Sequence, residues 1–302
     1  MKNALLVILI IFWKILVFFP RRFQNFIATV LGHFINCLPL KRNLISKVNI
    51  DLCFKDLSQK DRDNIHKKNT IEFAKVIFDT GISWFWSDNR IKKNIPYEIN
   101  GLQALLNNQN DKNGILLLFK HSLHLELDSR ILAMHSEIYG IEREHNSKMF
   151  ENIQRSGRLK SMKGITDRDN TLTFMRWLKK GKTVLYAPDQ DYGMKKSIKV
   201  NFFGIPAATV TAPLKIIEKT GCKVFFINSY FNNGKLILDL EEINIDQSSV
   251  ENFSRQLNLI IENKIRLHPH EYLGNIEGLY QHSERKKYIN EFSTNKKSKR
   301  IY

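Results

Sequence analysis

A histidine and a glutamate five positions apart follow a short apolar segment of the 302-residue chain. Residues Ile115–Phe119 form a continuous apolar run that is typical of a buried strand. The next residues are Lys-His-Ser-Leu-His-Leu-Glu. On one regular helix His121 and Glu126 would point about 140° apart. We therefore expect His121 in the turn before a helix at 123–135, with Ser122 as the N-cap of that helix.

This pair could act as a general base and its orienting carboxylate. A carboxylate bonded to one imidazole nitrogen fixes the tautomer, so that the other nitrogen can take a proton from a hydroxyl. The same spacing also fits a histidine that caps a helix beside a solvated glutamate. A metal site is a weaker interpretation because H-E-x-x-H spacing is absent. Its ligands would be His121, His124, Glu126 and Asp128. We expect neither a metal nor a cofactor.

A second polar loop, Pro-Asp-Gln-Asp-Tyr-Gly, follows another expected strand at 183–187. Ligands of open α/β sheets bind beyond the carboxyl ends of the strands, so both loops mark a candidate site. Asp189 and Asp191 could orient polar groups of a substrate or close a turn, and we favour the local structural role.

Helical and strand signals alternate between about residues 41 and 280, which predicts an α/β fold with a central mixed sheet flanked by helices. The expected helices are 65–86, 123–135, 172–180, 211–219 and 250–267. The expected strands are 115–119, 183–187, 222–231 and 235–240. The last two strands should form a hairpin around Asn-Asn-Gly.

The amino terminus is apolar from residue 4 to 19 except for Lys14, and Arg21 and Arg22 follow. Sixteen helical residues reach about 24 Å, against about 30 Å for the hydrocarbon core of a bilayer, so a crossing is marginal. A cleaved signal peptide fits the length, but a small-residue cleavage site is absent there and the arginines oppose translocation. We predict a retained N-terminal membrane-anchoring helix, with the rest of the chain on the cytoplasmic side.

Apolar residues recur at three- and four-residue intervals over 23–38 and predict a helix with an apolar stripe. The stripe consists of Phe23, Phe26, Ile27, Val30, Leu31, Phe34, Ile35 and Leu38. This helix either lies on a membrane or docks on the core of the domain. We expect an anchor and interfacial helix over 1–40, a catalytic domain over 41–285 and a solvated basic tail over 286–302.

The chain carries 47 Lys and Arg against 30 Asp and Glu, a net charge of +17, which predicts a polyanionic partner. The apolar amino terminus favours an anionic membrane, whose surface attracts each nearby basic side chain by about 1 kcal/mol. A tethered nucleic-acid-binding protein is the alternative from another class, but the sequence shows no such motif and we expect no nucleic-acid partner. The three cysteines lack C-x-x-C spacing, so neither a disulfide framework nor a zinc site follows from them.

Over about residues 114–230 an ordered series of motifs resembles the secondary (lauroyl/myristoyl) acyltransferases of lipid A biosynthesis. These belong to the larger set of glycerolipid acyltransferases that share H-x-x-x-x-[D/E]. The series comprises His121-Ser-Leu-His-Leu-Glu126, Arg143, Gly157-Arg158-Leu, Asp167-Arg168, Leu178-Lys-Lys-Gly181, Tyr186-Ala-Pro-Asp189-Gln-Asp191-Tyr-Gly193, Phe202-Phe-Gly and Ala207-Ala-Thr-Val-Thr-Ala-Pro213. The segment 270–285 departs from the family's Trp-x-His-Arg-Arg-Phe pattern.

The resemblance implies an acyltransferase of lipopolysaccharide biosynthesis at the bacterial inner membrane. It would transfer an acyl chain from an acyl carrier protein thioester to a hydroxyacyl hydroxyl of a lipid A precursor. His121 and Glu126 would be the catalytic pair. Arg143 would stabilise an oxyanion or bind a phosphate, and Arg168 would pair with a lipid phosphate or with Asp167. The alternative is an acyltransferase of a lysophospholipid or another membrane lipid that uses acyl-CoA or acyl carrier protein.

Overall fold

The computed structural model describes residues 2–110, 114–143, 147–190 and 193–273. The strands of the main sheet are β1 (Tyr97–Asn100), β2 (Ile115–Phe119), β3 (Ile138–Glu142), β4 (Gly164–Asp167), β5 (Thr183–Tyr186), β8 (Lys223–Asn232) and β9 (Lys235–Glu242). A separate antiparallel pair is formed by β6 (Ser197–Phe202) and β7 (Ile205–Val210).

The helices of the amino-terminal half are α1 (Lys2–Phe18), α2 (Arg21–Cys37), α3 (Lys41–Cys53), α4 (Gln59–Phe85), α5 (Asp88–Asn94), α6 (Leu102–Asn110) and α7 (Leu125–Ala133). The helices that follow are α8 (Lys148–Arg158), α9 (Thr171–Lys179), α10 (Ala212–Thr220) and α11 (Val250–Leu267). Two short 3₁₀ helices are η1 (Met194–Lys196) and η2 (Pro269–Glu271).

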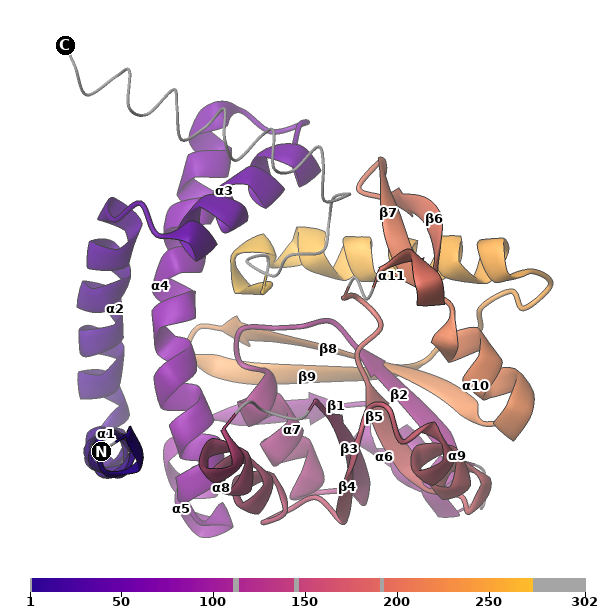
Figure 1. Cartoon of the computed structure of the whole chain (residues 1–302), viewed down its shortest axis with the longest axis horizontal. Coiled ribbons are helices and arrows are strands. Elements are labelled where there is room, and N and C mark those ends of the chain that lie inside the picture. The colour runs from indigo at the N-terminus through magenta and orange to yellow at the C-terminus, as the bar shows by residue number, and fades with distance from the viewer. Residues whose placement is uncertain (1, 111–113, 144–146, 191–192, 274–302) are drawn as a thin grey trace.

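The seven strands of the main sheet lie in the order β1-β9-β8-β2-β5-β3-β4. Strands β8, β2, β5, β3 and β4 are parallel to one another, whereas β9 is antiparallel to β8. The β8–β9 hairpin turns through Asn233 and Gly234, which have φ of 49° and 80°, as a tight turn between twisted strands requires. The expectation of a mixed central sheet flanked by helices is confirmed (Figure 1).

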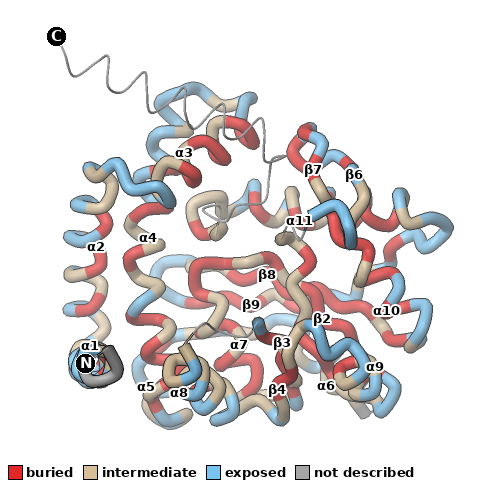
Figure 2. The backbone as a smooth tube through the Cα atoms, in the orientation of Figure 1, coloured by how far each residue is buried: buried red, intermediate tan, exposed pale blue. Residues whose placement is uncertain are grey.

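Strand β2 lies in the middle of the sheet and is buried on both faces. Ile115 and Leu117 belong to one hydrophobic core, whereas Leu116 and Leu118 belong to the other. The first core also contains residues of α4, α6 and α7, and the second contains residues of α9, α10 and α11. This burial explains why β2 is a continuous apolar run rather than an alternating one (Figure 2).

Several expected elements differ from the observed ones only at their ends. Helix α11 has the bounds that the sequence predicts. Helix α4 begins before the expected residue 65 because Ser58 is its N-cap and accepts a hydrogen bond from the amide of Asp61 at 3.2 Å. Gly181, expected as a left-handed cap, has φ of 76° and follows α9.

The amino-terminal helices do not support the predicted membrane-anchoring helix, for which a crossing is marginal by length. Helix α1 has 17 residues. Among the described residues, none of the helices combines the length and the apolar character that a bilayer crossing requires. The anchoring helix of the sequence-based prediction is therefore unsupported by the structure.

Helix α2 packs along α4 through its small residues rather than through its apolar stripe (Figure 1). Ala28 and Gly32 are buried in this contact, and a Cβ on Gly32 would lie 2.6 Å from the Cα of Ile71. Phe26 and Phe34 of the stripe are 65% and 61% exposed. The helix is therefore docked on the domain, but most of its stripe points away from the core.

Candidate active site

The two polar loops that the sequence marks meet at the carboxyl edge of the sheet. Strands β2 and β5 are parallel neighbours, and Leu118 pairs with Tyr186 in register. His121 lies three residues after Leu118, and Asp189 lies three residues after Tyr186. His121 lies in the turn between β2 and α7, as predicted. The sheet register thus brings His121 and Asp189 together.

Asp189 holds the imidazole and the backbone of His121. The Nδ1 of His121 lies 2.5 Å from Oδ1 of Asp189, and the His121 amide donates to Oδ2 at 2.8 Å. Burial alone would raise the pKa of Asp189, but the charge and hydrogen bonds of His121 outweigh it and lower that pKa below its ordinary value. An ionised carboxylate only accepts hydrogen bonds, so in the neutral ring the proton of His121 lies on Nδ1.

The other ring nitrogen of His121 faces Gln190. The side-chain amide nitrogen of Gln190 lies 2.8 Å from Nε2 of His121 and can donate to its lone pair. The His121 side chain is 13% exposed, whereas that of Asp189 is 1% exposed. Nε2 therefore carries the lone pair of the neutral ring.

The predicted hydrogen bond between Glu126 and His121 is wrong. Glu126 lies in the first turn of α7, and its carboxylate accepts from Nε1 of Trp84 at 2.8 Å and from the guanidinium of Arg158. Helix α7 packs against α4, which carries Trp84, and this contact directs Glu126 away from the imidazole. Burial would raise the pKa of Glu126, but the charge and hydrogen bonds of Arg158 and the Trp84 bond lower it. A catalytic role for Glu126 stays a prediction.

Arg158 joins two carboxylates below the site. Its guanidinium contacts Glu126 and donates to Glu142 at 3.0 Å. Burial would lower the pKa of Arg158, but the two glutamates raise it, so that the cation is firmly held. A Cβ on Gly157 would lie 2.5 Å from Trp84, so only glycine lets α8 approach α4 this closely. The Gly157-Arg158 motif was visible in the sequence, but its bridging role was not.

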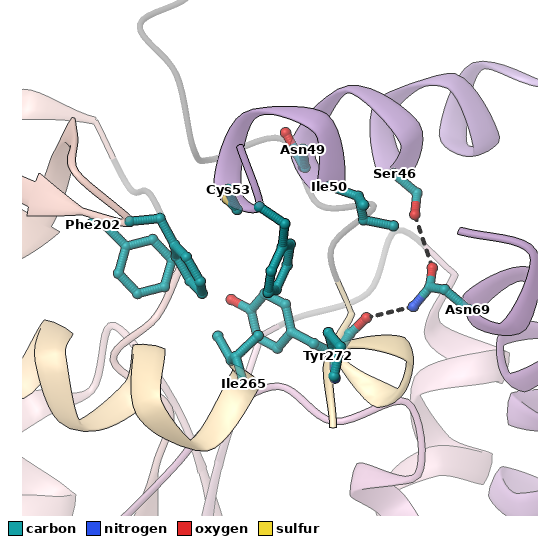
Figure 3. Close-up of a pocket in the computed structure, with 11 residues that line it drawn as sticks. Ser46, Asn49, Ile50, Cys53, Asn69, Phe202, Ile265 and Tyr272 are labelled. Atoms are coloured by element: carbon teal, nitrogen blue, oxygen red, sulfur yellow. Dashed lines mark hydrogen bonds between the residues drawn. The ribbon is translucent and has the colours of Figure 1, made fainter. Parts of the chain in front are cut away.

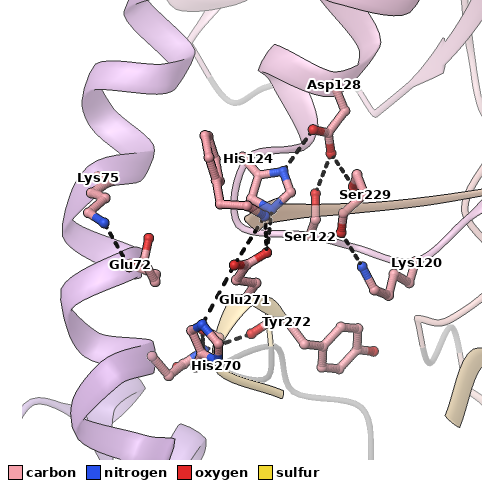
Figure 4. Close-up of polar contacts among 12 residues, drawn as sticks. Glu72, Lys75, Lys120, Ser122, His124, Asp128, Ser229, His270, Glu271 and Tyr272 are labelled. Carbon is pink, nitrogen blue, oxygen red and sulfur yellow. Dashed lines mark hydrogen bonds and ion pairs between the residues drawn. The ribbon is translucent and has the colours of Figure 1, made fainter. Parts of the chain in front are cut away.

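A second histidine of the same turn, His124, is buried between two carboxylates (Figure 4). Its Nδ1 lies 2.7 Å from Asp128 and its Nε2 lies 3.1 Å from Glu271. Burial would lower the pKa of His124, but the charges and hydrogen bonds of the two carboxylates raise it to about 10. His124 is therefore a cation at neutral pH.

Hydroxyls complete this buried network. Ser122 and Ser229 each donate to Oδ2 of Asp128 at 2.6 Å, and Nζ of Lys120 donates to the carbonyl of Ser229 at 2.8 Å. Ser122 is consequently not the N-cap of α7 that the sequence predicts, because its hydroxyl bonds to Asp128. The N-cap residue is His124, without a side-chain cap. The network connects the turn between β2 and α7 to Ser229 of β8.

Arg143 and Arg168 follow neighbouring strands at the same edge of the sheet. Glu142 pairs with Asp167 in the parallel register of β3 and β4, and each arginine is the next residue. The amide of Arg168 also donates to the carbonyl of Glu142 at 2.8 Å. Arg143 is exposed, and the Arg168 guanidinium lies 3.8 Å from Asp169. Their substrate roles stay predictions, and Asp191 lies outside the described residues.

The four residues of the weaker metal interpretation do not converge. His121 bonds to Asp189, Glu126 to Arg158, and His124 to Asp128. Within the described ranges, no group of three or more His, Cys, Asp or Glu side chains is placed to hold a metal ion.

An apolar pocket lies near the site (Figure 3). Its walls include Asn49, Ile50, Cys53, Phe202, Ile265 and Tyr272. Tyr272 places this pocket next to the turn that carries His121, because its backbone forms an antiparallel bridge with Ser122. Burial, and after it the charge of Asp189, raise the pKa of Tyr272 well above its ordinary value, so the hydroxyl keeps its proton.

Fold and site together define a class of protein: an α/β protein in which a histidine is held by a buried aspartate at the carboxyl edge of the sheet, near an apolar pocket. Residues 1–274 match the family described as bacterial lipid A biosynthesis acyltransferase. The chain therefore belongs to this family of acyl-transferring enzymes, as its resemblance predicts.

Individual relatives support the assignment. The chain is 34% identical over 201 residues to a lipid A biosynthesis acyltransferase of Haemophilus influenzae, covering 66% of this chain and 63% of that protein, less than two thirds of its length. It is 32% identical over 238 residues to the lipid A biosynthesis lauroyltransferase of Escherichia coli, covering 77% of each chain. It is 27% identical over 252 residues to the lipid A biosynthesis palmitoleoyltransferase of the same bacterium, covering 82% of each.

Proposed function

We propose that this protein transfers a fatty acyl chain from an acyl carrier protein thioester to the hydroxyl of a hydroxyacyl chain on a lipid A precursor. The observation that carries the proposal is the geometry of His121, whose Nδ1 lies 2.5 Å from the buried Asp189, so that Nε2 carries the lone pair of the neutral ring. Membership in the lipid A acyltransferase family supplies the substrate class.

The acceptor hydroxyl replaces the amide of Gln190 at Nε2 of His121. Nε2 takes the hydroxyl proton as the oxygen attacks the thioester carbonyl, and Asp189 stabilises the imidazolium that forms. The tetrahedral intermediate then collapses: the carbon–sulfur bond breaks and the thiolate recovers the proton from Nε2. General-base assistance of this kind contributes about 10²–10⁴-fold to the rate. An acyl-enzyme intermediate is not required.

The apolar pocket beside Tyr272 takes the acyl chain. Its walls come from α3, the β6–β7 hairpin and α11, and aliphatic and aromatic side chains predominate among them. A wall of this kind suits a hydrocarbon chain.

Arg143 and Arg168 bind phosphate groups of the acceptor. They follow paired residues of β3 and β4, at the edge of the sheet that also holds His121. Guanidinium groups form charge-assisted, often bidentate hydrogen bonds to phosphate. An acidic acyl carrier protein is also suited to a chain with a net charge of +17.

The enzyme acts at the cytoplasmic face of the bacterial inner membrane, and the exposed apolar surface of α1 and α2 rests in the bilayer interface. The most exposed of these side chains are Leu5, Ile8, Leu9, Phe12, Ile15, Phe26 and Phe34. An amphipathic surface of this type binds in the interface through its apolar area, assisted by the attraction of basic residues to anionic lipid.

Flotation with vesicles that contain anionic phospholipid tests the membrane proposal. Phe26→Glu combined with Phe34→Glu should reduce the bound fraction severalfold. Leu259→Glu is the matched control, because Leu259 is 52% exposed but lies on α11. Equal binding of the double variant and the control would reject α2 as the contact.

The acyl transfer is tested with purified enzyme, an acyl carrier protein thioester and a lipid A precursor, with the product identified by mass spectrometry. Acyl-CoA with a lysophospholipid is the parallel reaction. A mass increase of one acyl chain on the lipid A precursor supports the proposal. Transfer to the lysophospholipid alone would instead support the alternative acceptor.

A further inference from the structure

Two tight hairpins of the chain share a backbone shape but differ in the residues at their turns. The β8–β9 hairpin turns through Asn233 and Gly234, with φ of 49° and 80°, and the β6–β7 hairpin turns through Phe203 and Gly204, with φ of 51° and 70°. Two-residue turns with positive φ at both positions favour Asn-Gly. A bulky aromatic residue rarely adopts positive φ. Phe203 therefore lies where the backbone alone would favour asparagine.

The ring of Phe203 is buried, whereas Asn233 of the other turn is exposed. The ring centroid of Phe203 lies 5.3 Å from that of Phe54, at the end of α3, and 5.0 Å from that of Phe202. The guanidinium of Arg266, on α11, lies 5.0 Å from the Phe203 centroid. These contacts offset the cost of the backbone conformation. Phe202 and Phe203 also line the apolar pocket (Figure 3).

The hairpin that carries Phe203 is fixed by its neighbours. The side-chain amide of the buried Asn258, on α11, donates to the carbonyl of Asn201 at 3.0 Å and to the hydroxyl of Thr209 at 2.8 Å. Ile205, the first residue of β7, forms a buried cluster with two residues of α3. Helices α3 and α11 thus determine where the ring of Phe203 lies.

Another wall of the same pocket lies next to the turn that carries His121. Tyr272 lines the pocket, and its two neighbours in the chain bond to that turn. The amide of Leu273 donates to the carbonyl of His121 at 2.8 Å, and the amide of Leu123 donates to the carbonyl of Glu271 at 2.8 Å. The pocket therefore extends between the turn of the base and the β6–β7 hairpin.

We propose that Phe203 contacts the acyl chain and limits the chain length that the pocket accepts. The inference rests on the proposed function in that the pocket takes the acyl chain. A phenylalanine at a turn that favours asparagine is explained by its ring, which closes the pocket wall. A smaller apolar side chain leaves room for further methylene groups, and a larger one excludes them. Apolar pockets discriminate one methylene group by about 10–200-fold.

Phe203→Leu is the direct test, because it shortens the wall and keeps it apolar. Each enzyme is given an equimolar series of acyl carrier protein thioesters of graded chain length with the lipid A precursor, and mass spectrometry resolves the products. The kcat/KM for the chain next longer than the wild-type optimum, relative to that optimum, should rise about tenfold or more. Phe203→Trp should shift the preference toward shorter chains. The two shifts are opposite, so either variant that folds decides the question.

Phe253→Leu is the matched control. Phe253 lies on α11, is 1% exposed and belongs to the same hydrophobic core as Phe203, but the walls of the pocket are formed by other residues. This variant makes the same change in the same core, and thermal unfolding measures the loss of stability in both. Phe253→Leu should keep the wild-type chain-length preference. The same preference in Phe203→Leu as in this control would overturn the proposal.

Calorimetric titration with free fatty acids of graded length gives a readout that does not need turnover. Phe203→Leu should bind longer chains more tightly, relative to shorter ones, than the wild type does. Equal relative affinities in the two proteins, or no binding of any chain by the wild type, would also reject the inference. If the wild type bound fatty acids but transferred no acyl chain, the proposed function would fail, while the titrations would still decide the role of Phe203.

Discussion

Two histidines of one turn have opposite environments. His121 faces a single carboxylate, Asp189, and its side chain is 13% exposed. His124 lies between Asp128 and Glu271, is 3% exposed, and has a pKa raised to about 10. Of the two rings, that of His121 is the more exposed, whereas that of His124 is enclosed by its two carboxylates. Exposure and the number of carboxylates, rather than position in a motif, separate a base from a structural cation.

The cation at His124 has a structural purpose. Two carboxylates buried without a positive charge would be strongly unfavourable, and the imidazolium between them offsets that cost. His124 thereby joins Asp128 of α7 to Glu271, which lies in the segment after α11. The buried histidine therefore supports the exposed one, and variants of each should affect different properties.

His121→Ala should have the largest effect, lowering kcat by about 10²–10⁴-fold because the general-base contribution is lost. The thermal midpoint should stay close to that of the wild type, since the ring lies at the edge of the core. Steady-state kinetics with the acyl carrier protein thioester, alongside thermal unfolding, checks both. Near-wild-type turnover by a purified variant would reject His121 as the base.

Asp189→Asn should lower kcat by about 10²-fold. The amide keeps the size of the carboxylate but neither fixes the Nδ1–H tautomer nor stabilises the imidazolium. The comparison requires the pH profile of kcat for both proteins. If kcat of the asparagine variant stayed within threefold of the wild-type value, Asp189 would only stabilise the loop, which is the role that the sequence favours.

Glu126→Gln should lower kcat by about tenfold, less than the change at Asp189, because Glu126 holds Arg158 and does not contact the imidazole. Kinetic constants for the two carboxylate variants, measured under the same conditions, rank them directly. The reverse ranking would restore the pairing of His121 with Glu126 that the sequence suggests.

His124→Gln should change kcat of the folded enzyme by less than about threefold but should destabilise it by about 3–5 kcal/mol near pH 7, because two buried carboxylates lose their cation. The folded-state pKa of about 10 lies above the ordinary value of about 6.5. The wild type therefore keeps this stabilisation below pH ~6.5 and loses it as pH rises toward about 10.

Urea unfolding of both proteins at several pH values in this window measures the effect. The difference in unfolding free energy between the wild type and His124→Gln should narrow as the pH rises. A difference independent of pH would mean that His124 is neutral in the folded protein.

Local patterns of the sequence predicted the elements that carry the site, but not the contact that completes it. The apolar run of β2 and the amphipathic pattern of α11 are local signals, and both elements have the expected bounds. Placing His121 in a turn also followed from local geometry. The pairing with Asp189 depends on β2 and β5 being neighbours in the sheet, which local sequence patterns do not reveal. Local patterns therefore favour Glu126, which is closer to His121 along the chain.

Other differences have similar causes. Strands β3 and β4 are only five and four residues long, too short for a clear pattern, and were not predicted. The apolar stripe of α2 suggested which face would be buried, whereas the helix docks through Ala28 and Gly32 because small residues permit a closer approach to α4. Hydropathy identifies apolar faces but does not show which surface covers them.

The position of residues 269–273 in the chain has a consequence for biosynthesis. Translation proceeds from the amino terminus, so the strands that the structure describes are made before residues 269–273 leave the ribosome. Until then the carbonyl of His121 and the amide of Leu123 lack their hydrogen-bond partners from this segment. The turn that carries His121 therefore gains its last backbone contacts only after the strands beside it have been synthesised.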